Sequence, residues 1–494
     1  MKKYLTVFLA LLLASSALLT ACGEGNTETD RDPSADTEPS AATEMETETK
    51  LRDSLPDDLD FGGVSVTFHA RGDEVPMLEI EAEDMTGDVI NDAYYNRNIS
   101  IEERLNLDIV LYAAESWAKY DMAMTDLAAS IQSGDGAYQV VAGWVSGVTP
   151  MALEGYFMDL SDAPYLDLEK PWWNQEATET LRIGGVMNFI GGDVCFYSGL
   201  AGAFVYFQND ELAENYGIPS IPDMVRENEW TMDAAIGITK EIYVDTDGNG
   251  TMDTNDTYGI VNGAWACADG YYTAADIHQI VIDEKGMPAL VPQQERIAKL
   301  LETIAPFWLD PASAGAYCVW GGPEVDMFIN NQTLLSAFEL DAGVYSFRDM
   351  DASYTILPYP KLDDTQDYRT NATNGATLMA IPVDNTERLD ASCAAMEAIA
   401  AYNHLNIVDI YIETCLQEKF ARNEDTVDML NLIRESICMD VEHMFKAVLG
   451  ETMYVVRDLL IDSKNTNIAS WYASKTTGIE SAIQSTIATI EEMQ

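Results

Sequence analysis

Basic residues are scarce in this chain of 494 residues. It holds 27 Lys and Arg against 83 Asp and Glu, so its formal net charge at pH 7 is −56. Such a charge repels phosphate groups, so nucleic acid and anionic lipid surfaces are poor partners, and no nucleic-acid partner is expected. Histidine is also rare, and the four that exist are scattered: His69, His278, His404 and His443. The sequence therefore shows no zinc site and no catalytic histidine cluster.

Cysteine pairs of the CxxC type are missing. After the N-terminal region six cysteines remain: Cys195, Cys267, Cys318, Cys393, Cys415 and Cys438. The last three lie in helical patterns and are typical of small buried hydrophobic residues. Disulfides form outside the cell, but a body of this size does not require them, so the pairing stays open. Beyond the N-terminus no run is apolar and long enough to span a bilayer.

The N-terminus is the clearest targeting signal. Two lysines precede a mostly apolar run at 5–19, which is shorter than the roughly 20 residues of a membrane span. The run predicts a signal peptide over 1–21. Leu-Thr-Ala-Cys at 19–22 resembles the bacterial lipobox, and this resemblance implies a diacylglycerol, with acyl chains such as palmitate, on Cys22. The alternative is an ordinary signal peptide followed by a chance cysteine.

An acidic segment follows Cys22. Residues 23–60 hold 13 Asp and Glu against 3 Lys and Arg, with many Ser and Thr and few large apolar side chains. Such a segment cannot bury enough surface to offset its ordering entropy, and its like charges extend it. We therefore expect residues 22–55 to be a disordered tether that holds the body off the membrane.

The body alternates strands and helices. Strands are predicted at 64–68, 107–112, 138–142, 203–207, 354–357 and 377–381, and helices at 89–105, 122–132, 209–216 and 230–243, with a largely helical chain from 389 onward. This alternation indicates an α/β fold with parallel sheets, and the length exceeds that of one core, so two lobes are expected.

Several segments, taken in order, resemble one family. They are Gly87 to Leu105, Tyr-Gln-Val-Val-Ala at 138–142, Phe-Met-Asp-Leu-Ser at 157–161, Lys-Pro-Trp-Trp-Asn at 170–174, Val-Tyr-Phe-Gln-Asn-Asp at 205–210 and Ile-Leu-Pro-Tyr-Pro-Lys at 356–361. Their order over 60–494 is similar to bacterial extracellular solute-binding proteins of family 1, the mostly sugar-binding lipoproteins of ABC importers.

The resemblance implies a two-lobed, periplasmic-binding-protein-like (type II) α/β fold with crossover hinge strands and a helical C-terminal part. It implies lobe one at 56–195 plus 336–385 and lobe two at 196–335 plus 386–494. The expected function is capture of a small solute, above all a carbohydrate, at the extracellular face of the cytoplasmic membrane, and its delivery to an ABC permease. No catalysis is expected.

Two other function classes stay open. A secreted glycan-active enzyme would need a pair of carboxylates flanking a cleft, and 83 acidic residues neither exclude nor single out such a pair. A surface adhesion module is the other class, and the absence of internal repeats in the sequence speaks against repeat arrays.

Candidate ligand-binding residues combine aromatic rings with polar groups, because sugars present flat C–H faces and many hydroxyls. The candidates are Arg71, Trp144, Tyr197, Trp265, Trp320, Glu339 and Asp341. They follow predicted strands or lie in glycine-rich loops or near the expected crossovers, where open α/β sheets bind ligands. For each, the alternative is core packing or a solvated charge. Five other tryptophans are interpreted as packing residues: Trp117, Trp172, Trp173, Trp308 and Trp471.

Residues 245–256 form the sharpest motif. Their pattern, D-x-D-x-N-G-x-x-D-x-x-D, matches the ligand positions of an EF-hand loop and predicts a structural Ca²⁺ site. The expected ligands are Asp245, Asp247, Asn249, the Thr251 carbonyl, Asp253 through water, and Asp256. The residues at 257–260 are typical of a strand rather than a second EF-hand helix. The loop is therefore expected to be a clamp inside a larger domain, and the alternative is a polar turn without metal.

Overall fold

The computed structural model describes residues 51–263, 265–319, 322–342, 346–347, 350–372, 376–412 and 424–493. The predicted signal peptide, Cys22 and nearly all of the predicted tether lie outside these residues. The chain divides into two units, 1–51 and 52–494, and the description below concerns the second. Among the described residues, no helix combines the length and the apolar character that crossing a bilayer requires.

The first sheet has the strand order β2-β1-β3-β13-β4. Its members are β1 (Val64–Ala70), β2 (Leu107–Ala113), β3 (Val140–Trp144), β4 (Phe189–Ile190) and β13 (Thr377–Ala380). Strand β1 runs parallel to β2 and β3, whereas β13 runs antiparallel to β3 and β4. A strand from late in the chain therefore lies between two early ones.

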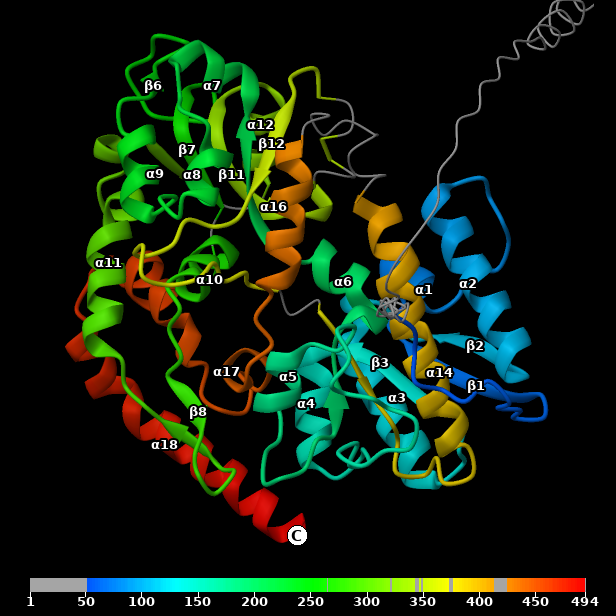
Figure 1. Cartoon of the computed structure of the whole chain (residues 1–494). Coiled ribbons are helices and arrows are strands. Elements are labelled where there is room, and N and C mark those ends of the chain that lie inside the picture. The colour runs from blue at the N-terminus through cyan, green and yellow to red at the C-terminus, as the bar shows by residue number, and fades with distance from the viewer. Residues whose placement is uncertain are drawn as a thin grey trace, which may run out of the picture. The chain divides into compact units, whose positions relative to one another are not determined.

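The second sheet has the order β10-β7-β11-β5-β12, and β6 pairs with β7. Its members are β5 (Phe204–Asn209), β6 (Tyr243–Val244), β7 (Thr257–Gly263), β10 (Ala316–Val319), β11 (Thr333–Glu339) and β12 (Tyr354–Leu357). Strands β10, β7 and β11 are parallel, and β5 runs antiparallel to β11 and β12. Two sheets of this kind, covered by helices, confirm the predicted α/β class (Figure 1).

Helices cover the sheets and form most of the chain after 389, as predicted. They are α1 (Glu74–Ile80), α2 (Val89–Leu105), α3 (Tyr120–Ser133), α4 (Val145–Leu153), α5 (Gln175–Thr180), α6 (Phe196–Ala201), α7 (Asp210–Tyr216), α8 (Ile221–Arg226), α9 (Met232–Thr239), α10 (Trp265–Ala274), α11 (Gln294–Leu309), α12 (Pro323–Ile329), α14 (Leu389–Tyr402), α16 (Glu424–Glu435), α17 (Val441–Met444) and α18 (Ile468–Met493). A small hairpin pairs β8 (Ile280–Ile282) with β9 (Pro288–Leu290). Helix α18, red in Figure 1, contacts α11, β9 and α4.

Local sequence explains where α2 and α7 begin and end. The side chain of Asp88 accepts hydrogen bonds from the first amides of α2, and Asn209 does the same for α7. Helix α2 ends at Asn106 and α7 at Gly217, both in the left-handed conformation that closes helices. These caps satisfy backbone groups at the helix ends and so fix where α2 and α7 begin and end.

The second sheet is packed around aromatic rings. Phe207, Phe328, Phe338, Phe347 and Tyr354 are all buried and come from β5, α12, β11, a loop and β12. Neighbouring ring centroids lie 4.7 to 6.2 Å apart, within the range of favourable aromatic pairs. This core joins strands that are far apart in the sequence.

The pairing of segments within the two sheets does not follow the predicted lobe boundaries. Residues 336–385 were assigned to lobe one, yet the end of β11 and all of β12 hydrogen-bond within the second sheet. Helix α14 was assigned to lobe two, yet it packs on strand β1 of the first sheet and on helix α2. Of the segment 336–385, β13 alone among its strands joins the first sheet. The patterns at 354–357 and 377–380 are both short apolar strands, and nothing local to them encodes the pairing partner.

Candidate functional site

Predicted site residues lie where parallel strands end. Arg71 directly follows β1, Trp144 ends β3 and Glu339 ends β11. Trp265 is the first residue of α10 and lies two residues beyond the end of β7. Ligands of open α/β sheets bind beyond the carboxyl ends of the strands, so these positions are suited to binding. Trp320, a further predicted ligand residue, lies outside the described residues.

Arg71 and Trp144 form a buried pair. The guanidinium carbon of Arg71 lies 5.7 Å from the centroid of the Trp144 ring, within range of a cation–π interaction. Arg71 is 8% exposed and Trp144 is 1% exposed. Burial lowers the pKa of Arg71, while the charges of Asp73, Glu79 and Glu339 raise it, and an arginine remains charged under these conditions. The neighbourhood therefore holds a fixed cation among carboxylates.

Glu79 ties α1 to α6 beside this cation. Its carboxylate is buried and accepts a hydrogen bond of 3.0 Å from the backbone N–H of Ser198. Burial raises the pKa of Glu79 to about 7, against the lowering effect of Ser198 and Arg71. The adjacent Tyr197, a predicted ligand residue, is buried with its ring centroid 4.9 Å from that of Tyr411. Glu79 was not predicted, because one acidic residue in a helix carries no distinguishing pattern.

Glu339 and Asp341 bring charge from the end of the second sheet. Desolvation raises the pKa of Glu339 to about 7, Asp341 raises it further, and Arg71 lowers it. Desolvation also raises the pKa of Asp341. The Glu339 side chain is nevertheless exposed, so solvent reaches a carboxylate that neighbouring protein atoms partly desolvate. Because the charge of Arg71 lowers the pKa of Glu339, the ends of β1 and β11 share one electrostatic neighbourhood.

Trp117 is an exposed aromatic residue that the sequence interpretation treated as packing. It lies beyond the end of β2, just before α3, and is 52% exposed. Its ring centroid is 6.0 Å from that of Trp144 and 5.3 Å from that of Tyr120, and Tyr120 lies 5.4 Å from Trp144. Trp144 is covered, whereas Trp117 offers a free face held by two rings. Its position after a strand was the signal that could have identified it.

Trp172 and Trp173 are packing residues, as the sequence indicated. Both are buried, and both indole N–H groups donate to the carboxylate of Glu397, at 3.2 and 2.9 Å. Trp471 is also buried and donates to Asp458. These side chains stabilise the fold and do not line the site at the strand ends.

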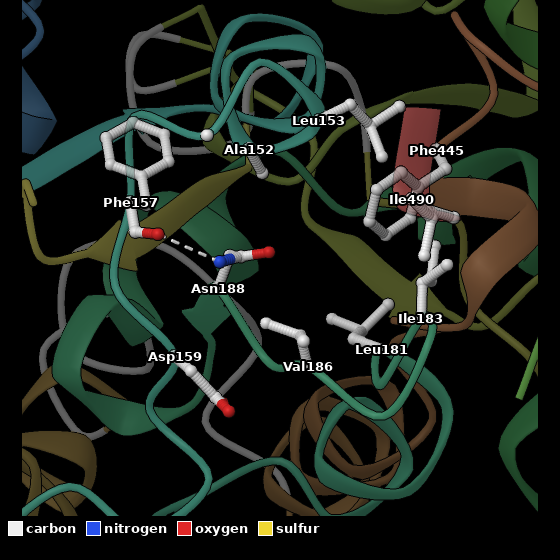
Figure 2. A pocket seen from close by; sticks show the side chains of 11 residues that line it. Ala152, Leu153, Phe157, Asp159, Leu181, Ile183, Val186, Asn188, Phe445 and Ile490 are labelled. Carbon is white, nitrogen blue, oxygen red and sulfur yellow. Dashed lines mark hydrogen bonds between the residues drawn. The ribbon is translucent and has the colours of Figure 1, made fainter. Parts of the chain in front are cut away.

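A cavity of about 300 Å³ lies elsewhere, and Figure 2 shows its lining. Its walls are Ala152, Leu153, Gly155, Phe157, Asp159, Leu181, Ile183, Val186, Asn188, Phe445 and Ile490. The Asn188 amide donates to the Phe157 carbonyl at 3.0 Å, so one of its few polar groups is already engaged. The hydroxyls of a sugar would lack partners in this mostly apolar space, which contains none of the predicted ligand residues.

The predicted metal loop forms a compact acidic group. Asp245, Asp247 and Asp256 each offer a carboxylate oxygen, and these three oxygens lie within 4.8 Å of one another. Asp253, Asn249 and Thr251 lie in the same loop, whose ends are joined by the pairing of β6 with β7. Oxygen ligands in this arrangement suit a hard divalent cation.

No protein-family model matches the sequence, and neither does any curated protein. The fold, in contrast, is similar to those of many solved structures. One is the galacto-N-biose-/lacto-N-biose I-binding protein of an ABC transporter from Bifidobacterium longum, with a TM-score of 0.54 and 12% identity over 86% of this chain and 98% of that one. Another is the GacH receptor of Streptomyces glaucescens, with a TM-score of 0.51 and 13% identity over 87% and 97%.

A cyclo/maltodextrin-binding protein complexed with maltotetraose gives a TM-score of 0.51 and 11% identity, again over 87% of this chain and 97% of that one. All three are named as binding proteins or receptors rather than as enzymes. The chain thus has the two-lobed fold of the solute-binding proteins of ABC transporters. The resemblance noted in the sequence is confirmed at the level of the fold.

Proposed function

We propose that this protein is a lipid-anchored solute-binding protein that captures a carbohydrate and delivers it to an ABC import permease. The observation that carries the proposal is the packing of Arg71 and Trp117 on Trp144 beyond the ends of three strands, where the charge of Arg71, after β1, also acts on Glu339, at the end of β11. A ligand that bonds to Arg71 and Glu339 would link two sheets, and lobe closure around a ligand is a known way to signal occupancy to a partner.

The chemistry of the site supports a polar, uncharged ligand. Arg71 offers donors, Glu339 and Asp341 offer acceptors, and a sugar hydroxyl uses both. Trp117 offers a flat apolar face on which a sugar ring stacks, held in place by Tyr120 and Trp144. The three similar structures named above are described as binding lacto-N-biose, acarbose and maltotetraose, respectively.

Anchoring is the second half of the proposal. Cys22 would carry the lipid, and the acidic segment 22–55 would hold the body away from the membrane. The localisation that follows is the extracellular face of the cytoplasmic membrane. One or two acyl chains give an anchor of this kind without a spanning helix.

The test begins with a thermal-shift screen of mono- and oligosaccharides, because a ligand that binds only the native state raises the melting temperature. Calorimetry on the best sugar then compares the wild type with Trp117→Ala. Loss of a stacking aromatic is expected to weaken binding by about 2 kcal/mol, or roughly 30-fold. Tyr216→Ala removes another exposed aromatic, at the end of α7, and is expected to leave affinity unchanged.

Two results would contradict the proposal in different ways. Equal affinity of Trp117→Ala and the wild type would refute the stacking surface and leave the ligand class standing. Release of shortened glycans during incubation with purified wild type would instead favour the enzyme alternative.

A further inference from the structure

The loop at 245–256 closes a hairpin of the second sheet. Tyr243 of β6 pairs with Tyr258 of β7, and Val244 pairs with Thr257, so the two ends of the loop are held side by side. Gly250 has a φ of +72°, in the left-handed region that side chains with a Cβ rarely adopt. The loop contains four aspartates and no lysine or arginine. No side chain of the loop therefore carries a positive charge that would balance its four aspartates.

Three of these aspartates converge. The oxygens of Asp245, Asp247 and Asp256 lie within 4.8 Å of one another, and like charges at this separation repel. Asp256 is fully buried, and its carboxylate accepts hydrogen bonds from the backbone N–H groups of Thr246 and Asp253, at 3.0 and 3.2 Å. Asp256 is thus fixed in place before any ligand arrives.

Asp245 provides a second, independent observation. One of its oxygens accepts a hydrogen bond from the Gly250 N–H at 2.9 Å. Its other oxygen, Oδ1, is buried without a hydrogen-bond partner among the described residues. A buried carboxylate oxygen without a donor is costly, and a cation bound to it removes that cost. The orphaned oxygen belongs to the same three-carboxylate group.

We propose that this loop binds one Ca²⁺ ion. Asp245, Asp247 and Asp256 would supply carboxylate oxygens, and the rest of the loop would complete the set through Asn249, the Thr251 carbonyl and Asp253 by way of water. A flexible loop offering six or more oxygens suits Ca²⁺ better than Mg²⁺, which demands a near-ideal octahedron.

The ion would act on the sheet rather than on the sugar site. It would neutralise the carboxylates and hold β6 against β7, which lies between β10 and β11. Tyr243 and Tyr258 donate their hydroxyls to Asp256 at 3.2 and 3.4 Å, so two phenol rings lie beside the metal position. This arrangement supplies an optical readout, because tyrosine excitation sensitises the luminescence of a bound Tb³⁺ ion.

The experiment titrates the metal-stripped mature protein with CaCl₂ by calorimetry, and separately with Tb³⁺ while exciting tyrosine. We expect one site with a dissociation constant on the order of 10⁻⁴ M or tighter. At 1 mM Ca²⁺ the melting temperature should rise by about 1 to 2 °C, and Ca²⁺ should quench the sensitised Tb³⁺ emission. Mg²⁺ at the same concentration should quench it less.

Asp247→Asn is the informative variant, because Asp247 is exposed and its loss leaves the buried Asp256 in place. It should weaken Ca²⁺ binding by about tenfold or more, since one charged ligand is lost. Asp283→Asn is the matched control. Asp283 caps the β8–β9 turn by accepting from the N–H groups of Lys285 and Met287, and no metal is expected there.

Absence of both heat and stabilisation in the wild type at millimolar Ca²⁺ would overturn the proposal. Equal binding by Asp247→Asn and the wild type would overturn it as well, because the ion would then lie elsewhere. Neither outcome bears on sugar binding, which is measured separately at Trp117.

Discussion

Replacing Glu397 by glutamine changes how the stability of the protein depends on pH. Glu397 lies in α14, is fully buried, and accepts from the indoles of Trp172 and Trp173 and from the backbone N–H of Asp167. Burial raises its pKa from 4.5 to about 7, although these three donors lower it. The folded protein therefore holds this proton more tightly than the unfolded chain.

The sign and the size of the change in unfolding free energy with pH follow from this difference in the pKa of Glu397. Below about pH 4.5 the carboxyl is protonated in both the folded and the unfolded state, so folding buries no charge at this position. Between about pH 4.5 and 7 the free energy of unfolding falls as pH rises, because the unfolded chain ionises first. Above pH 7 the loss is complete and amounts to about 3 kcal/mol, at 1.36 kcal/mol for each unit of pKa.

Glu397→Gln removes this loss at high pH but adds a constant cost. A glutamine amide has one acceptor oxygen and turns two donors toward groups that also donate, so at least one buried N–H is left unpaired, at about 1–3 kcal/mol. At pH 5 the variant should be the less stable protein by that amount. At pH 8 the cost of the buried charge in the wild type nearly offsets the cost of the unpaired N–H in the variant, so the two proteins should have similar stability.

Urea unfolding of both proteins from pH 4.5 to 8 measures the effect. The difference in unfolding free energy between variant and wild type should change by about 3 kcal/mol across this range, and other titrating groups such as Glu79 cancel in the difference. Glu435→Gln, at an exposed position of α16, serves as the control and should give a curve parallel to that of the wild type. Parallel curves for Glu397→Gln would refute the reasoning.

Two further predictions concern the anchor and the cavity. Cys22→Ala should release the protein from membranes in cell fractionation, because no acyl chain can attach, and a variant that stays bound as before would refute the anchor. Val186→Leu places an added methylene at the cavity wall of Figure 2 and should raise the free energy of unfolding in urea by about 0.5–1 kcal/mol. A decrease would mean that the wall leaves no room for it.

Local structure was largely predictable from the sequence. Helix α2 occupies the predicted 89–105 and β12 the predicted 354–357 without any shift, because caps and apolar periodicity mark their ends directly. The strand predicted at 138–142 lies at 140–144 instead. Its predicted start, Tyr138, is only partly buried, and the strand begins at Val140, from which every residue is buried.

Pairing and exposure were less predictable, because both depend on residues far away in the chain. The sequence identified Arg71 and Trp144 from their places at or after strands and Glu339 from its place near an expected crossover, and the structure puts all three at strand ends. It did not indicate that Trp144 is covered while Trp117 is exposed, since either ring could have been the inner one. Which strands β12 and β13 join was equally hidden, because both are short apolar segments with similar patterns.

The place of β13 in the first sheet governs the order in which the protein can fold. Strands β3 and β4 leave the ribosome early, but both pair with β13, which follows the entire second sheet in the chain. Helix α14, which covers β1 and α2, is made later still. Closing so long a loop is slow, and until then β4 has no partner strand in this sheet. The first sheet can therefore be completed only once β13 and α14 have been made, and α16, which packs on β12 of the second sheet, follows later still.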